Sequence, residues 1–274
     1  MTIGRRYKRT LLELAVILFS IPILLPFYML VVNSFKNKEE SADIGLSLPT
    51  EWNITDNYKQ LIDTGNILTG FKNSIILTVV PIVLVVLIVS LASFVLQRRT
   101  QRLSAMLYSF FILGMILPGF IVPTVMIAKT LHIPQYAGLL LVYATGLIPI
   151  GMFLYVGYFK SIPRDIDESA WMDGCGMLVF FYRIIFPLVS PVTATFMIIS
   201  FLTIWNDFGT SLYFLSGKAN QTLTLTMFYF FGPHSADWNL VFACIVISTL
   251  PVVVFYLLLQ KYVVAGMTGG AVKG

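Results

Sequence analysis

Six apolar runs in this sequence are each close to the length that a helix needs to cross a lipid bilayer, about 20 residues. Charged residues are scarce: they make up 11% of the 274 residues, whereas a soluble domain has about a quarter. A globule of this size has too little interior to bury so much apolar surface. The sequence therefore predicts an all-α polytopic membrane protein with six transmembrane helices. The six runs are Leu11–Val32, Ser74–Leu96, Ala105–Ala128, Gly138–Phe159, Leu188–Leu215 and Leu240–Leu259.

We expect one transmembrane domain over residues 1–274. Its parts are an N-terminal helix at 11–32, core helices within 74–259, a loop at 161–187 and a tail at 260–274. The first apolar run follows a cluster of basic residues, as in a signal peptide, but it is too long and lacks a small-residue cleavage pattern. We therefore expect it to be retained as a helix.

The distribution of Lys and Arg predicts the orientation, because cytoplasmic loops of membrane proteins are enriched in both. With the N-terminus inside, twelve of the 18 basic residues fall on the cytoplasmic side and six outside. Both termini are then cytoplasmic, and the largest outside segment is 37–70, with a short helix expected near Asn57–Ile62. The six outside residues are Lys36, Lys38, Lys59, Lys72, Lys129 and Lys218.

The placement of charges, cysteines and histidines, together with the motifs that are absent, disfavours several classes of function. The charges lie between apolar runs and form no basic face, which argues against a nucleic-acid partner. Two cysteines and two histidines, far apart in the sequence, offer neither a disulfide framework nor a set of metal ligands. The sequence has no Gly-x-Ser-x-Gly motif and no Gly-x4-Gly-Lys-[Ser/Thr] phosphate loop. We expect no catalytic residue, no metal and no cofactor in this chain.

The connection between the fourth and fifth runs, 161–187, has the pattern of two short helices. Ser161 is expected to cap the first, which carries acidic residues near its start and should run to Asp173. Gly174 can supply the left-handed residue that ends it. A second, amphipathic piece should stop at Pro187. The segment is thus predicted to be a projecting structure on the cytoplasmic side, either functional or a simple interfacial anchor.

The residues of this segment resemble the coupling loop of bacterial ABC importer permeases. Glu168-Ser169-Ala170 is followed by Gly174 after three residues, and by Ile184, Phe186 and Pro187 after nine more. Ser169 and Phe186 depart from the alanine and leucine of that pattern but keep its spacing. The resemblance implies that the loop docks on a cytoplasmic ATPase. The coupling residues that it assigns are Glu168, Ser169, Ala170, Asp173, Gly174, Ile184 and Pro187.

Other segments are similar to the carbohydrate-uptake permeases of the maltose and multiple-sugar type. These are Asn33-Ser34-Phe35-Lys36, Trp205-Asn206-Asp207-Phe208 and the Gly-rich C-terminal end. The resemblance implies that Ala271, Val272, Lys273 and Gly274 reach between ATPase subunits, unless that end is only a flexible tail.

The resemblance also implies the assembly and its location. The chain would be one half of a heterodimeric permease in a bacterial cytoplasmic (inner) membrane, surrounded by lipid. Its other partners would be two copies of an ABC ATPase, which bind ATP and Mg²⁺, and an extracytoplasmic sugar-binding protein. The solute would be a mono- or oligosaccharide.

Polar residues at membrane depth are candidates for the solute path, since they are costly against lipid. Trp205, Asn206 and Asp207 lie late in the fifth apolar run and are the possible sugar-path residues. Trp205 could equally be an interfacial aromatic anchor, and the other two could serve helix packing.

Two alternatives remain at this stage. The solute could be other than a sugar. Less favoured is an ion-coupled secondary transporter, because such carriers need ionisable groups near the membrane midplane and these runs have almost none.

Overall fold

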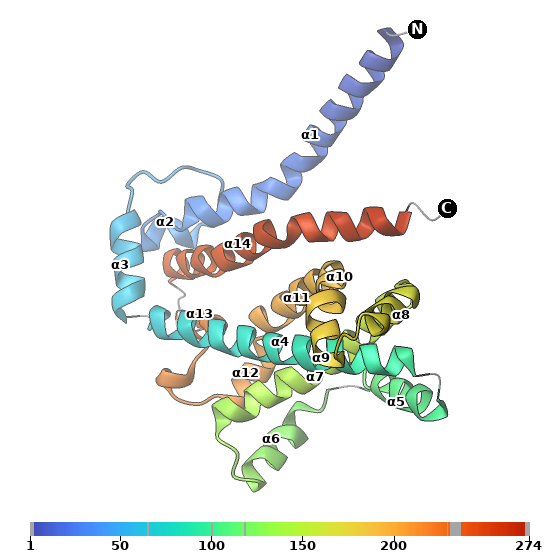
Figure 1. Cartoon of the computed structure of the whole chain (residues 1–274). Coiled ribbons are helices and arrows are strands. Elements are labelled where there is room, and N and C mark those ends of the chain that lie inside the picture. Colours follow the sequence, from blue (N-terminus) through green and yellow to red (C-terminus); the bar gives the residue numbers. More distant parts are fainter. Residues whose placement is uncertain are drawn as a thin grey trace. The chain divides into compact units, whose positions relative to one another are not determined.

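The computed structural model describes residues 3–64, 66–99, 101–117, 119–228, 230 and 237–271 (Figure 1). Every regular element among these residues is helical, in agreement with the all-α prediction. The chain divides into two compact units. The first comprises residues 1–68 and 225–250, and the second residues 69–224 and 251–274.

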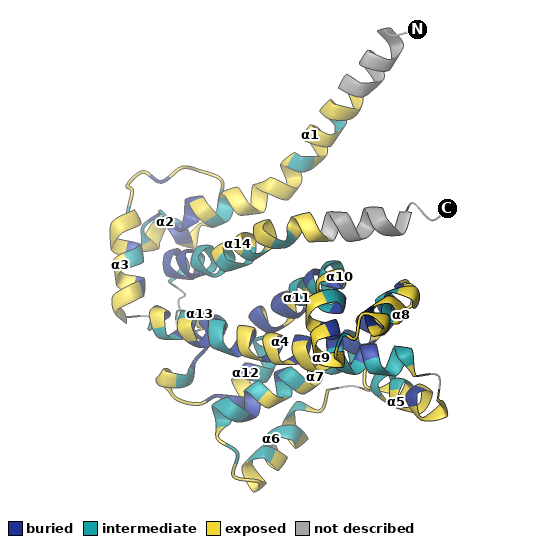
Figure 2. Ribbon diagram, viewed as in Figure 1, coloured by how far each residue is buried: buried dark blue, intermediate teal, exposed yellow. Residues whose placement is uncertain are grey.

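The first unit contains a long N-terminal helix, two short helices and the start of the last helix. The helix α1 (Ile3–Asn33) carries almost only apolar residues between Leu11 and Val32, and its side chains there are largely exposed (Figure 2). Such a surface requires lipid or another chain around it. The short helix expected near residue 57 is present and longer than predicted, as α3 (Ile54–Thr64), and α2 (Lys38–Ala42) was not foreseen.

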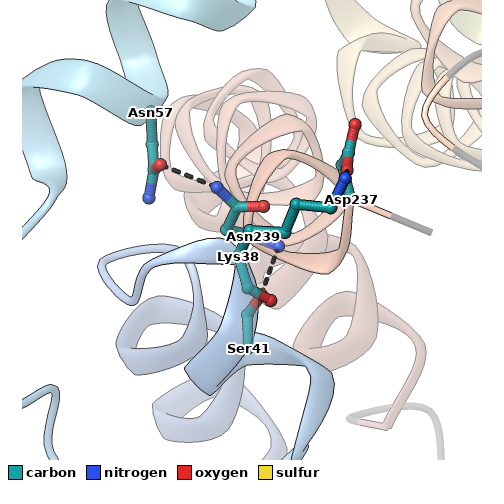
Figure 3. Close-up of polar contacts among 5 residues, drawn as sticks. All are labelled: Lys38, Ser41, Asn57, Asp237 and Asn239. Atoms are coloured by element: carbon teal, nitrogen blue, oxygen red, sulfur yellow. Dashed lines mark hydrogen bonds and ion pairs between the residues drawn. The ribbon is translucent and has the colours of Figure 1, made fainter. Parts of the chain in front are cut away.

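A buried polar cluster fixes the end of α1 to α3 and to the start of α14 (Trp238–Ala271) (Figure 3). The Asn57 amide donates to the backbone carbonyls of Ser34 and Lys36, at 2.9 and 2.8 Å. The Asn239 amide donates to Asn57 Oδ1 at 2.8 Å, and the Asn239 backbone N–H donates to Ser41 Oγ. These bonds satisfy backbone groups that a helix end leaves unpaired, so the cluster holds α2 and α3 against the start of α14.

The second unit is built around α7 (Gln135–Phe159). Its other apolar helices are α4 (Ile67–Arg98), α5 (Arg102–Leu113), α6 (Ile121–Thr130), α11 (Ser190–Trp205) and α12 (Gly209–Phe214). The helix α7 packs against α5, α11 and α12 and also contacts α4. The connecting elements are α8 (Asp165–Met172), α9 (Met177–Phe180), a π-helical turn at Phe181–Ile185, α10 (Phe186–Leu188) and a 3₁₀ turn at Lys218–Asn220. The helix α13 (Leu223–Phe228) follows, and its residues from Leu225 onward belong to the first unit.

Gly151 allows three helices of this unit to approach closely. A Cβ atom at this position would lie 3.1 Å from the ring of Phe196 on α11 and 3.1 Å from a methyl group of Val89 on α4. Met152 and Tyr155, on the same side of α7, are fully buried. Small residues have this role in membrane helices, because packing rather than hydrophobic exclusion holds such helices together.

Two of the predicted spans are not continuous helices. The run Ala105–Ala128 forms α5 and α6, since the helix tightens into a turn at Gly114 and the sequence there also contains Gly119. The run Leu188–Leu215 breaks after Trp205, and α11 is followed by the short α12. Gly and polar side chains favour such breaks where neighbouring groups can replace the lost helix bonds.

Four described helices are long and apolar enough to cross a membrane: Leu11–Asn33, Ile67–Arg98, Gln135–Phe159 and Trp238–Tyr262. A fifth span would combine Met177–Leu188 with Ser190–Trp205, which meet at a 72° bend. The helix that holds the last predicted span, α14, continues to Ala271, and the bounds of the core at 74–259 remain a prediction. A polytopic helical protein is therefore confirmed, and six spans remain a prediction.

Candidate functional site

The segment between α7 and α11 ends its first helix as the sequence predicted. Gly174 has φ +71°, in the left-handed region that favours glycine. The Cys175 N–H donates to Ala170 O, and the Gly174 N–H donates to Trp171 O, at 3.0 and 3.1 Å. These two bonds form a Schellman motif, which closes the last turn of α8. The segment therefore turns sharply at Gly174.

Two local predictions for this segment are wrong. Ser161 does not cap α8, which begins at Asp165; its hydroxyl instead donates back to Tyr158 O at 2.7 Å. The chain also does not break at Pro187. It remains helical to Leu188 and bends at Val189, because a proline is tolerated in the first turn of the short α10.

Aromatic side chains attach this segment to the membrane helices of its own unit. The Phe94 ring of α4 lies 5.7 Å from Phe159 of α7, 6.0 Å from Phe180 and 5.7 Å from Phe181, measured between ring centroids. All four side chains are buried. Aromatic pairs at these distances add to the free energy gained by burial. The second half of the segment is thus packed onto α4 and α7.

An ion pair attaches the first half of the segment, α8, to the end of α4. Arg98, the last residue of α4, contacts the Asp167 carboxylate through Nε at 2.6 Å and through Nη2 at 3.0 Å. Its remaining amine, Nη1, donates to Ile162 O at 3.3 Å. The side chains are 14% and 18% exposed, so water screens this pair less than a surface pair. Arg98 therefore connects a membrane helix directly to α8.

The predicted coupling residues lie on different sides of the segment. Ala170 is only 5% exposed and faces its own chain, and its contact with an ATPase remains a prediction. Trp171 and Met172 are 72% and 90% exposed and were missed by sequence reasoning. Large apolar residues in an otherwise polar short helix were the available signal. The other predicted residues divide into the exposed Glu168, Ser169, Asp173 and Pro187 and the half-buried Ile184.

The predicted sugar-path residues lie at the break between α11 and α12. Trp205 is buried, stacked on Phe201 with ring centroids 5.3 Å apart. Asn206 is exposed and donates its amide to Leu202 O, which closes the end of α11. Trp205 thus packs within its unit, while the Asn206 side chain is exposed.

Asp207 takes part in a polar network that sequence reasoning did not identify. Its carboxylate accepts the Tyr143 hydroxyl at 2.7 Å and the Thr210 N–H at 3.3 Å. Tyr143 Oη also lies 2.9 Å from Ser211 Oγ. These contacts fix the break between the two helices against α7. Nothing in the sequence distinguishes Tyr143 from the other tyrosines of the apolar runs.

The remaining predicted site lies at the C-terminal end. Val272, Lys273 and Gly274 fall outside the described residues, and Ala271 is the last residue of α14. Within the described part of the chain, no group of three or more His, Cys, Asp or Glu side chains is placed to hold a metal ion.

Comparison with known proteins identifies similar chains. Residues 88–269 match the family model described as "Binding-protein-dependent transport system inner membrane component". The probable starch degradation products transport system permease protein of Thermoanaerobacterium thermosulfurigenes is 35% identical over 268 residues, which cover 97% of both chains. The melibiose/raffinose/stachyose import permease protein of Bacillus subtilis is also 35% identical, over 254 residues and 91% of both chains.

A solved structure has the same fold. It is a bacterial ABC transporter involved in the import of the acidic polysaccharide alginate. It matches with a TM-score of 0.80 over 96% of this chain and 99% of that chain, at 19% identity.

Proposed function

This chain belongs to the family of binding-protein-dependent transport system inner membrane components, and from this we propose that it is the permease subunit of an ATP-driven sugar importer. It is a multi-pass inner membrane protein and a transporter permease, not an enzyme. The observation that carries the sugar assignment is 35% identity, over nearly the whole chain, to permeases for starch products and for raffinose-type oligosaccharides.

The proposed assembly has a second permease chain, two ATPase subunits and an extracytoplasmic binding protein. The family's dependence on a binding protein supports the last of these. The exposed apolar side chains of α1 are suited to lipid on one side and to a second permease on the other. ATP and Mg²⁺ would bind to the ATPase subunits, so this chain has only to transmit their movement.

The proposed contact with an ATPase subunit is the exposed face of α8 and the turn at Gly174. Trp171 and Met172 offer apolar area there, and Glu168, Ser169 and Asp173 surround them with polar groups. An apolar centre with a polar rim is the usual composition of a protein interface. In this arrangement Ala170 holds α8 against its own unit, and Gly174 orients the contact surface.

The proposed solute path passes the helix break at Asn206 and Asp207. The Asn206 side chain is exposed there, and in the proposed path its amide carbonyl accepts hydrogen bonds from sugar hydroxyls. Asp207, held by Tyr143 and Thr210, keeps the broken helix in a fixed position.

Uptake by the purified complex tests the function. Vesicles containing this chain, its partner permease and the ATPase should accumulate maltose-type or raffinose-type oligosaccharide only with internal ATP and external loaded binding protein. Collapse of proton and sodium gradients at constant ATP should leave uptake unchanged. Uptake that stops on collapse, or that proceeds without ATP, would contradict the proposal.

Replacing Trp171 and Met172 together with serine should reduce the amount of ATPase that co-purifies with the permease at least tenfold. Burial of one large apolar side chain contributes about 1.5 to 3 kcal/mol, and each 1.4 kcal/mol is a factor of ten in affinity. The matched control replaces the exposed Trp52 and Leu48, in the outside segment, with serine. Equal ATPase recovery in both double variants would exclude α8 as the contact.

Cysteine labelling tests the orientation. In a background lacking the two free cysteines, Cys175 and Cys244, we expect a membrane-impermeant reagent to modify Asp43→Cys in intact cells and to spare Gln101→Cys. Both positions are exposed, so burial does not limit the reaction. After permeabilisation both should react. The reverse order would place both termini outside.

A further inference from the structure

A pocket in the second unit is lined by three basic side chains from three separate segments. Arg99 follows α4, Lys160 follows α7 and Arg164 precedes α8. Among the described residues, no hydrogen bond or ion pair engages any of these three charged groups, and the nearby Asp167 is paired with Arg98. Three like charges around one pocket repel each other unless an anion enters it.

The pocket also contains a polar group suited to an anion and a wall suited to an acyl chain. Ser104 is only 8% exposed, lines the pocket, and has no hydrogen-bond partner for its hydroxyl among the described residues. The Ser104 side chain can therefore donate its hydroxyl to an acceptor on a ligand in the pocket. Leu96, Ala105 and Val156 supply the apolar wall.

We propose that this pocket binds the headgroup of an anionic phospholipid, such as phosphatidylglycerol. It lies where the membrane helices α4 and α7 end and α5 begins, which is the level at which lipid headgroups reside. Basic pockets between helix ends bind acidic headgroups by charge and hydrogen bonding. The phosphodiester lies among Arg99, Lys160 and Arg164 and accepts from Ser104, while the acyl chains follow the apolar wall. This inference requires membrane insertion and does not depend on the solute.

Native mass spectrometry of the intact transport complex, released from nanodiscs of equal phosphatidylglycerol and phosphatidylcholine content, tests the proposal. We expect wild type to retain at least one phosphatidylglycerol in preference to phosphatidylcholine. The double variant Lys160→Gln with Arg164→Gln should weaken that retention about 10- to 30-fold, since each basic residue near a membrane surface contributes about 1 kcal/mol. The control double variant, Arg183→Gln with Lys261→Gln, loses the same charge from exposed positions outside the pocket and should retain the lipid.

Four outcomes would overturn the lipid site. Equal loss in both double variants would indicate diffuse surface attraction, and equal retention of phosphatidylcholine would exclude recognition of charge. Displacement by millimolar inorganic phosphate as efficiently as by phosphatidylglycerol would indicate a free-phosphate site. Unchanged lipid retention with loss of the ATPase subunits in the pocket variant would assign these cations to the ATPase interface.

Discussion

Replacing Gly174 with valine is expected to lower the affinity of the permease for its ATPase roughly 5- to 150-fold and to reduce sugar uptake in proportion. Gly174 has φ +71°, and a β-branched residue in that region costs about 1 to 3 kcal/mol. The variant would relieve this strain by opening the Schellman bonds at the end of α8. The exposed Trp171 and Met172 would then lose their fixed orientation. Co-purification and a titration of ATPase onto the reconstituted permease measure the loss.

Gly176→Val is the matched control for this variant. A Cβ atom at either glycine would have no other atom within 4 Å, so space is not the difference between them. Gly176 has φ −66° and ψ 146°, which valine adopts readily. We therefore expect Gly176→Val to retain ATPase and uptake. If the two variants behave alike, either both intact or both inactive, the left-handed turn has no specific role in coupling.

Long, uninterrupted apolar runs were the part of the fold that the sequence predicted well. The runs at 74–96, 138–159 and 240–259 lie within α4, α7 and α14, because a span in lipid must satisfy all its backbone hydrogen bonds within one helix. The runs at 105–128 and 188–215 were predicted equally firmly and are broken. A hydropathy pattern reports depth in the membrane, and it does not report where neighbours such as Tyr143 compensate a break at Asp207.

For the candidate coupling site, the sequence predicted the turn at Gly174 but not which side of α8 is buried and which is exposed. The turn depends on one local feature, a glycine after a polar helix, and such local signals can be recognised in a sequence. The helix α8 has eight residues, too few for a hydrophobic period to show which side is buried. The sequence therefore did not indicate that Ala170 faces its own chain or that Trp171 is exposed. Contacts such as Arg98–Asp167 join residues 69 positions apart and are set by tertiary packing alone.

Arg98→Gln should leave the permease in the membrane with its partner but uncouple it, so that loaded binding protein no longer stimulates ATP hydrolysis. The substitution leaves the Asp167 carboxylate without its bidentate partner in a site that is 18% exposed. Breaking a fully buried ion pair destabilises a protein by about 3 to 5 kcal/mol. Because this pair retains some contact with water, we expect a somewhat smaller loss of stability. The lost contact is the polar connection between α4 and α8, and α8 would no longer follow movements of the membrane helices.

A double-mutant cycle separates this connection from a general effect of charge. Asp167→Asn alone should uncouple as Arg98→Gln does, and the double variant should be no worse than either. The coupling energy between the two sites, from the stimulation of ATP hydrolysis, should be about 1 to 3 kcal/mol. Arg102→Gln removes the same charge from an exposed residue four positions further along, and stimulation should persist. Additive losses in the cycle, or equal losses in Arg98→Gln and Arg102→Gln, would show that the ion pair does not transmit movement. Because Arg98 also donates to Ile162 O, any loss in Arg98→Gln beyond that of Asp167→Asn measures this second bond.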